Sequence, residues 1–135
     1  MTLAPGLTGH ASMTVGTRDT APRVGSGRIA VLATPIMINL IEEAALAAVE
    51  QHLDPGRQTL GTRLDISHIA ATPVGMTVTA TAELTAVNGR ALTFRIEARD
   101  ETDLIGEGMH ERVIVTAEKF EARVAEKAKA AKAAG

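Results

Sequence analysis

The chain has 135 residues, enough for one domain with a substantial hydrophobic core, and it contains no cysteine. Disulfides, thiolate nucleophiles and cysteine metal ligands are therefore excluded. A net charge of −2 and an aromatic content of 1% argue against a nucleic-acid partner, which would need a basic surface and stacking rings. The first residues lack the basic and apolar regions of a signal peptide, so we expect a cytoplasmic protein.

The N-terminal part has a weak pattern. Residues 1–10 are rich in Gly, Pro and Thr and are expected to be loosely held. A short first strand is expected over Met13–Thr17. The segment Asp19–Gly27 contains Pro22 and Gly25, and we expect it to form a loop.

One long helix is predicted from Thr34 to Leu53. Thr34 is a suitable N-cap, Pro35 suits the first helical position, and Asp54-Pro55-Gly56 ends the helix. The segment Ile36–Leu46 is apolar on nearly every face, which indicates a buried helix. It is too short and too polar in its middle to span a bilayer, so no membrane partner is expected.

The remainder of the domain has the pattern of strands. They are expected over Leu60–Ser67, Met76–Ala86, Arg90–Asp100 and Leu104–Glu118. The middle two alternate apolar and polar residues and are joined by Asn88-Gly89, a strong signal for a type I′ hairpin. One strand, a helix and four further strands predict an α+β fold, in which an antiparallel meander forms a curved five-stranded sheet wrapped around the central helix. One sheet covers one side of an apolar helix, so we expect a second copy to cover the rest, with the sheets joined edge to edge.

The C-terminal residues 121–135 are mostly Ala, Lys and Glu. High helical propensity with low apolar content predicts a frayed helix or a disordered tail. The expected organisation is a flexible N-terminus at residues 1–10, one domain at residues 11–120, and an Ala/Lys-rich helix or tail at residues 121–135.

Two adjacent carboxylates, Glu42 and Glu43, interrupt the apolar helix. A carboxylate in such a helix is costly unless it is paired or exposed. Neighbouring residues point about 100° apart, so one carboxylate can face a pocket while the other reaches solvent. A solvated helix face would explain both residues without any function.

His68 and Thr34 are the other candidates for chemistry. His68 ends a strand, and a histidine beside a buried carboxylate can act as a general base, although a structural histidine has the same pattern. The Thr34 hydroxyl can cap the helix, or it can act on a substrate at the helix N-terminus, where free N–H groups favour negative charge. The histidine spacing gives no zinc motif, and neither a metal nor a cofactor is expected.

The order of these residues resembles a known family. The segments that carry the resemblance are Ala33-Thr34-Pro35 with Glu42, Leu60-Gly61-Thr62, the run from Ser67 to Val78, and the stretch from Gly106 to Arg112. Together they resemble the hot-dog-fold acyl-CoA thioesterases, in the branch that includes fluoroacetyl-CoA thioesterase. The resemblance implies a hot-dog fold, a homodimer or larger homo-oligomer, and hydrolysis of acyl-CoA to free acid and coenzyme A.

The same resemblance implies a site. It assigns Thr34, Glu42 and His68 as the catalytic set, with Gly61 and Arg112 as substrate-binding neighbours. Thr34 or Glu42 attacks the thioester, or Glu42 orients a water, while His68 moves the proton. If Thr34 caps the helix, the eight residues to Glu42 span about 12 Å. Either the helix starts later, or the three groups meet across a dimer interface.

The segment Asp19–Leu32 is short and has no aromatic residue, whereas the fluoroacetyl-specific member of the family has an aromatic lid before its Thr. This difference favours a short or medium acyl group. The alternative function is a non-catalytic acyl-CoA-binding or sensing module on the same fold, but this chain has no room for the DNA-binding segment that a regulator usually carries. An enoyl-CoA hydratase would need an Asp/His motif that the sequence lacks.

Overall fold

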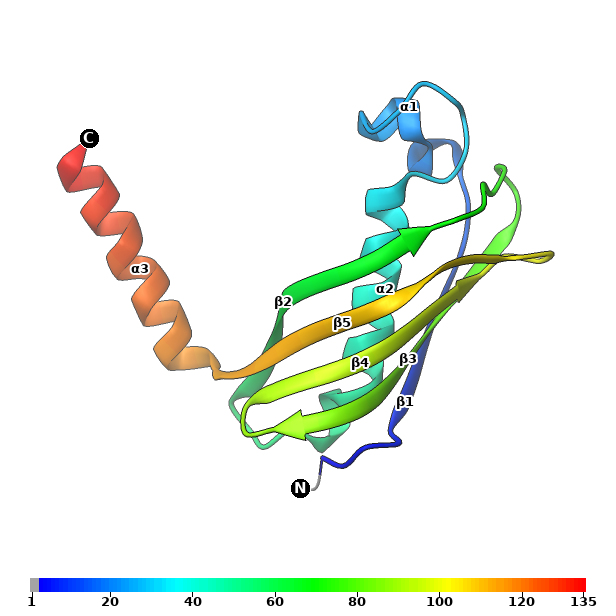
Figure 1. The fold of residues 1–135 in the computed structure, drawn as a ribbon. Coiled ribbons are helices and arrows are strands. Elements are labelled where there is room, and N and C mark those ends of the chain that lie inside the picture. Colours follow the sequence, from blue (N-terminus) through cyan, green and yellow to red (C-terminus); the bar gives the residue numbers. More distant parts are fainter. Residues whose placement is uncertain (1–2) are drawn as a thin grey trace.

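A computed structural model describes residues 3–135, and Met1 and Thr2 lie outside the described part. Five antiparallel strands form one curved sheet around a central helix, as expected (Figure 1). The strands are β1 (Thr8–Thr14), β2 (Arg57–His68), β3 (Thr77–Asn88), β4 (Ala91–Arg99) and β5 (Leu104–Thr116). The helices are η1 (Thr17–Asp19), α1 (Ala21–Val24), α2 (Thr34–Val49), η2 (Glu50–His52) and α3 (Ala117–Ala134).

The strand order is β1-β3-β4-β5-β2. The expected meander of the last four strands is therefore wrong for β2, which does not lie next to β3. β3, β4 and β5 are consecutive neighbours, but β2 pairs with β5 at the edge, and β1 pairs with β3 at the opposite edge. The connection from β2 to β3 therefore crosses one end of the sheet. It is held there because the Leu32 N–H donates to the Thr72 carbonyl at 2.8 Å.

The first strand begins at Thr8, earlier than the expected Met13. Residues 8–10, which were expected in the loose N-terminal segment, pair with β3. Asp19–Gly27 contains the short helical turns η1 and α1 rather than an unstructured loop.

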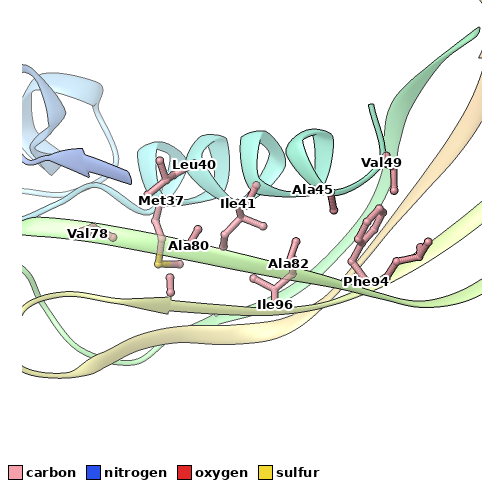
Figure 2. Packing of buried hydrophobic residues seen from close by; sticks show 14 of the residues in the cluster. Met37, Leu40, Ile41, Ala45, Val49, Val78, Ala80, Ala82, Phe94 and Ile96 are labelled. Carbon is pink, nitrogen blue, oxygen red and sulfur yellow. The ribbon is translucent and has the colours of Figure 1, made fainter. Parts of the chain in front are cut away.

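The alternating pattern of β3 and β4 is confirmed, and it forms the sheet side of the core. The inward residues are Val78, Ala80, Ala82 and Leu84 on β3 and Leu92, Phe94, Ile96 and Ala98 on β4, all of them buried. The buried residues of α2 recur every three or four positions and are Met37, Leu40, Ile41, Ala44, Ala45, Ala48 and Val49. The two sets face each other directly (Figure 2), and the small alanines let the helix lie close to the sheet.

At Gly9 the backbones of β1 and α2 are in contact. A Cβ placed at this position would overlap the Ala44 carbonyl oxygen and the Ala48 nitrogen. Gly9 therefore sets the distance between the first strand and the helix that carries Glu42.

The helix α2 packs on β1 and β3 and leaves the region over β2 largely uncovered. Leu64 of β2, which pairs with the inward-facing His110, is consequently 42% exposed, whereas Leu60 is 39% exposed on the opposite, outer face of the sheet. Ile38, Glu42 and Leu46, one turn apart on the flank of α2, are half-buried. A single chain thus leaves one apolar flank of the helix and one sheet edge open to solvent.

The last helix, α3, projects away from the sheet beyond β2 (Figure 1). It is anchored where the Ala117 N–H donates to the Gly56 carbonyl at 2.9 Å, and none of its residues is buried. β5 ends at Thr116, two residues before the expected end of the strand. Within residues 3–135, no helix has the length and apolarity needed to cross a membrane.

Candidate active site

Thr34 and His68 meet because the start of the helix α2 lies next to the end of the strand β2. Thr34 is the first residue of α2, and His68 is the last residue of β2. The Thr34 Oγ1 and His68 Nδ1 atoms are 2.7 Å apart and form a hydrogen bond. The expected capping role of Thr34 is wrong, because Ala33 occupies the N-cap position and no side chain caps this helix. The hydroxyl is directed to the imidazole instead.

His68 is held in a form suited to accept a proton. Burial lowers the pKa of its imidazole below the ordinary value of 6.5, and the Ala70 backbone opposes this effect in part. The ring is therefore neutral near pH 7. Its second nitrogen, Nε2, is buried without a hydrogen-bond partner among residues 3–135. A buried polar atom of this kind is unusual in a folded protein and marks a position where chemistry is feasible.

Glu42 is paired with Arg112, the other inward-facing charged group of the site. The Arg112 Nη1 donates to Glu42 Oε2 at 3.2 Å. The arginine side chain is 5% exposed, whereas that of the glutamate is 38% exposed. Burial lowers the pKa of the guanidinium, and Glu42 opposes that shift. The adjacent Glu43 is exposed, so the two carboxylates differ in environment: Glu42 is half-buried beside Arg112, whereas Glu43 faces solvent.

Arg112 is fixed by two further sets of contacts that the sequence reasoning did not assign. Its Nε donates to Thr59 Oγ1 at 2.9 Å and its Nη2 donates to the Thr59 carbonyl at 3.0 Å. Its Nη1 also donates to His110 Nε2 at 3.1 Å, and His110 Nδ1–H donates to the Arg63 carbonyl at 2.8 Å. Thr59, His110 and Arg112 all point inward in their strands, and three polar residues on an otherwise apolar face were a usable signal.

Gly61 lies where the carboxylate of Glu42 approaches β2 most closely. A Cβ at this position would be 2.6 Å from Glu42 Oε2 and 3.2 Å from His110 Cε1. A register shift between Gly61 and Arg63 also interrupts the ladder with β5 at this point. Glycine is therefore needed here for space.

Within one chain the site forms two clusters, one with Thr34 and His68 and the other with Glu42, Gly61 and Arg112. Because α2 begins at Thr34 itself, the eight residues from Thr34 to Glu42 are all helical and span about 12 Å. A later helix start, one of the two alternatives, is excluded. Among residues 3–135 there is no group of three or more His, Asp or Glu side chains placed to hold a metal ion.

A family model described as fluoroacetyl-CoA-specific thioesterase matches residues 15–118. The chain belongs to this thioesterase family. It is 48% identical over 97 residues to the fluoroacetyl-CoA thioesterase of Streptantibioticus cattleyicolor, which covers 72% of this chain and 70% of that protein.

Solved structures of the family have the same fold. A structure of the fluoroacetyl-CoA thioesterase FlK matches with a TM-score of 0.88 and 38% identity, covering 94% of this chain and 98% of that one. A thioesterase superfamily member from Thermus thermophilus matches with a TM-score of 0.87 and 26% identity, covering 98% of each chain. These matches confirm the hot-dog fold and the family expected from the sequence.

Proposed function

We propose that this chain hydrolyses acyl-CoA thioesters to free acid and coenzyme A, with Thr34, Glu42 and His68 as its catalytic set. The observation that carries the proposal is the 2.7 Å hydrogen bond between the Thr34 hydroxyl and the half-buried His68 imidazole. Fluoroacetyl-CoA thioesterase is the activity named for a 48% identical relative, and acyl-CoA hydrolysis is its general form.

The chemistry needs one nucleophile and one proton carrier. Glu42 attacks the thioester carbonyl or orients a water that does so, with Thr34 as the alternative nucleophile. His68 is neutral near pH 7 because burial lowers its pKa, so it can accept the proton released by water or by the Thr34 hydroxyl. With water as the attacking group, a C–O bond forms, the C–S bond breaks, and the proton that His68 took from the water passes to the departing thiolate. With Glu42 or Thr34 as the nucleophile, an acyl-enzyme forms as the C–S bond breaks, and a water that gives its proton to His68 then hydrolyses the acyl-enzyme to the free acid. Neither a metal nor a cofactor takes part.

A homodimer joined along β2 is the assembly that supports this scheme. The edge of β2 has unpaired backbone groups beside exposed Leu60 and Leu64, and Glu42 lies on the half-buried flank of α2 next to it. A second copy would cover this flank and could bring its own Thr34–His68 pair to the Glu42 of the first. The acyl-CoA site would then lie between two protomers.

The acyl group is proposed to be short or medium in length. The segment before Thr34, with η1 and α1, contributes no aromatic ring that could close over a small fluorinated acyl group. A cytoplasmic location, where we expect acyl-CoA to be met, stays a prediction from the sequence.

The activity is tested by thiol release from a series of acyl-CoA esters, from acetyl to long-chain. His68→Ala is expected to reduce kcat by about 10²- to 10⁴-fold, as for loss of a general base. Glu42→Gln is the informative change at the helix, because it keeps an oxygen for Arg112 and removes the charge. Cleavage of no ester would refute the proposal, and tight acyl-CoA binding without turnover would favour the binding-module alternative.

The shared site is tested by mixing two inactive variants, His68→Ala and Glu42→Gln. If each site takes its His68 and Glu42 from different protomers, a randomised equal mixture regains about a quarter of the wild-type activity, because half of the dimers are mixed and each has one intact site. If both residues come from one protomer, the mixture stays inactive.

A further inference from the structure

A chain of hydrogen bonds lies behind Glu42 and ends at a buried histidine. His110 is fully buried on β5, against the ring of Phe94, with ring centroids 6.1 Å apart. Its Nδ1 faces the Arg63 carbonyl at 2.8 Å, and its Nε2 faces Arg112 Nη1 at 3.1 Å. The same Nη1 donates to Glu42 Oε2 at 3.2 Å. One nitrogen of Arg112 therefore joins His110 to the catalytic carboxylate.

The partners of His110 fix where its proton resides. A carbonyl oxygen can only accept, so Nδ1 must carry the hydrogen. A guanidinium nitrogen can only donate, so Nε2 must be bare. This geometry is consistent with a neutral imidazole in one tautomer and with no other form of the ring.

We propose that His110 is a positioning residue for Glu42, acting through Arg112. Its bare Nε2 accepts one hydrogen of Arg112 Nη1 and thereby directs the other hydrogen of that nitrogen toward the Glu42 carboxylate. Thr59 holds the remaining side of the same guanidinium through Nε and Nη2. This inference rests on the catalytic role proposed for Glu42, and it assigns His110 no contact with substrate.

Protonation of His110 would break the arrangement, because an Nε2–H group would then face the hydrogens of Arg112 Nη1. The charged groups that act on the ring are Arg112 and Glu111 on its own strand, β5, and Glu42 from α2. Burial and Arg112 lower the pKa of His110, while the Arg63 carbonyl and the two carboxylates act against them. The neutral form is thus retained near neutral pH, and the acid limb of kcat would contain a contribution from this group.

The test compares His110→Gln with His110→Leu. Glutamine offers a carbonyl oxygen to Arg112, whereas leucine fills the space and offers no acceptor. We expect kcat to fall at least about 30-fold in His110→Leu, with KM within about threefold of the wild type, and to stay within about fivefold in His110→Gln. The acid limb of the kcat profile should lose one titrating group in the glutamine variant.

A matched control separates positioning from stability. Val49→Ala removes buried core volume from α2 about two turns from Glu42, so it lowers the melting temperature while kcat stays unchanged below that temperature. Equal losses of kcat in both His110 variants, or none in His110→Leu, would overturn the inference.

A second readout does not depend on activity. The ¹⁵N shifts of the His110 ring report its tautomer directly, and at neutral pH we expect a protonated Nδ1 and a bare Nε2. A charged ring or the opposite tautomer would overturn the positioning role even in an active enzyme. If the expected tautomer is found but no acyl-CoA ester is cleaved, the proposed function fails and the hydrogen-bond geometry stands.

Discussion

A small change at Gly61 should lower the catalytic rate while the stability of the fold is kept. A Cβ at this position would lie 2.6 Å from Glu42 Oε2, which is the end of a flexible side chain. In Gly61→Ala the carboxylate must move, but no backbone has to shift. We expect kcat to fall at least about tenfold, while the free energy of unfolding changes by less than about 1 kcal/mol. Steady-state kinetics and urea unfolding measure the two effects.

The matched control is Thr62→Ala, at an exposed position next to Gly61. It should leave both kcat and stability near the wild-type values. Full activity in Gly61→Ala would mean that the position of this carboxylate is not critical.

The half-buried His68 and the buried His110 should make the fold sensitive to acid. Burial lowers the pKa of both His68 and His110 below 6.5 in the folded state. The unfolded chain then binds protons first as the pH falls, so the stability present above about pH 6.5 is lost progressively toward the lowered pKa values. We expect the free energy of unfolding, measured by urea at about pH 7.5 and about pH 5.5, to be smaller at the lower pH.

Replacement of both His68 and His110 by glutamine should reduce this pH dependence. A stability that rises toward pH 5.5 in the wild type would contradict the assignment of both shifts.

At the scale of the elements, the contact between β1 and α2 is a sensitive packing feature. A methyl group at Gly9 would overlap backbone atoms of Ala44 and Ala48, and backbone cannot turn away as a side chain can. We expect Gly9→Ala to destabilise the fold by about 2 kcal/mol or more. Chemical unfolding gives the value, and His10→Ala, exposed on the same strand, provides the control. An unchanged stability would show that α2 can move away from β1 without cost.

Local sequence patterns predicted the elements that are determined by residues close together in the chain. The alternation in β3 and β4 predicted a hairpin and its buried face correctly. The predicted type I′ turn at Asn88-Gly89 is wrong, because Asn88 pairs with Ala91 as the last residue of β3 and does not have the positive φ that this turn requires. The place of β2 was predicted wrongly, because a strand next in sequence does not have to be next in the sheet. Its position depends on pairing with β5, some 50 residues later, and no local pattern encodes that choice.

The site shows the same division. The spacing of Thr34, Glu42 and His68 and the family resemblance were sufficient to name candidates, and their catalytic roles stay a proposal. The hydrogen bond from Thr34 to His68 replaced a capping bond that the local sequence favoured. Thr59 and His110 were not assigned, because their importance comes from a guanidinium that is shared across two strands.

On the scale of the whole molecule, α3 contributes little to the single chain. None of its residues is buried, and it extends beyond the sheet (Figure 1). We expect deletion of residues 121–135 to change the free energy of unfolding of the dilute protein by less than about 0.5 kcal/mol. Melting temperatures at low and high protein concentration measure this. A large decrease would contradict the independence of this helix, and a decrease confined to high concentration would show that α3 contacts another copy.

The open edge of β2 has a consequence for how the protein must be handled. The single chain presents a row of backbone amides and carbonyls beside exposed leucines, which invites misplaced strands from other chains. The irregularity between Gly61 and Arg63 bends this edge and limits how long an incorrect ladder can grow. Precipitation during refolding or overproduction should therefore originate at the edge nearest Glu42, and slow dilution should suppress it.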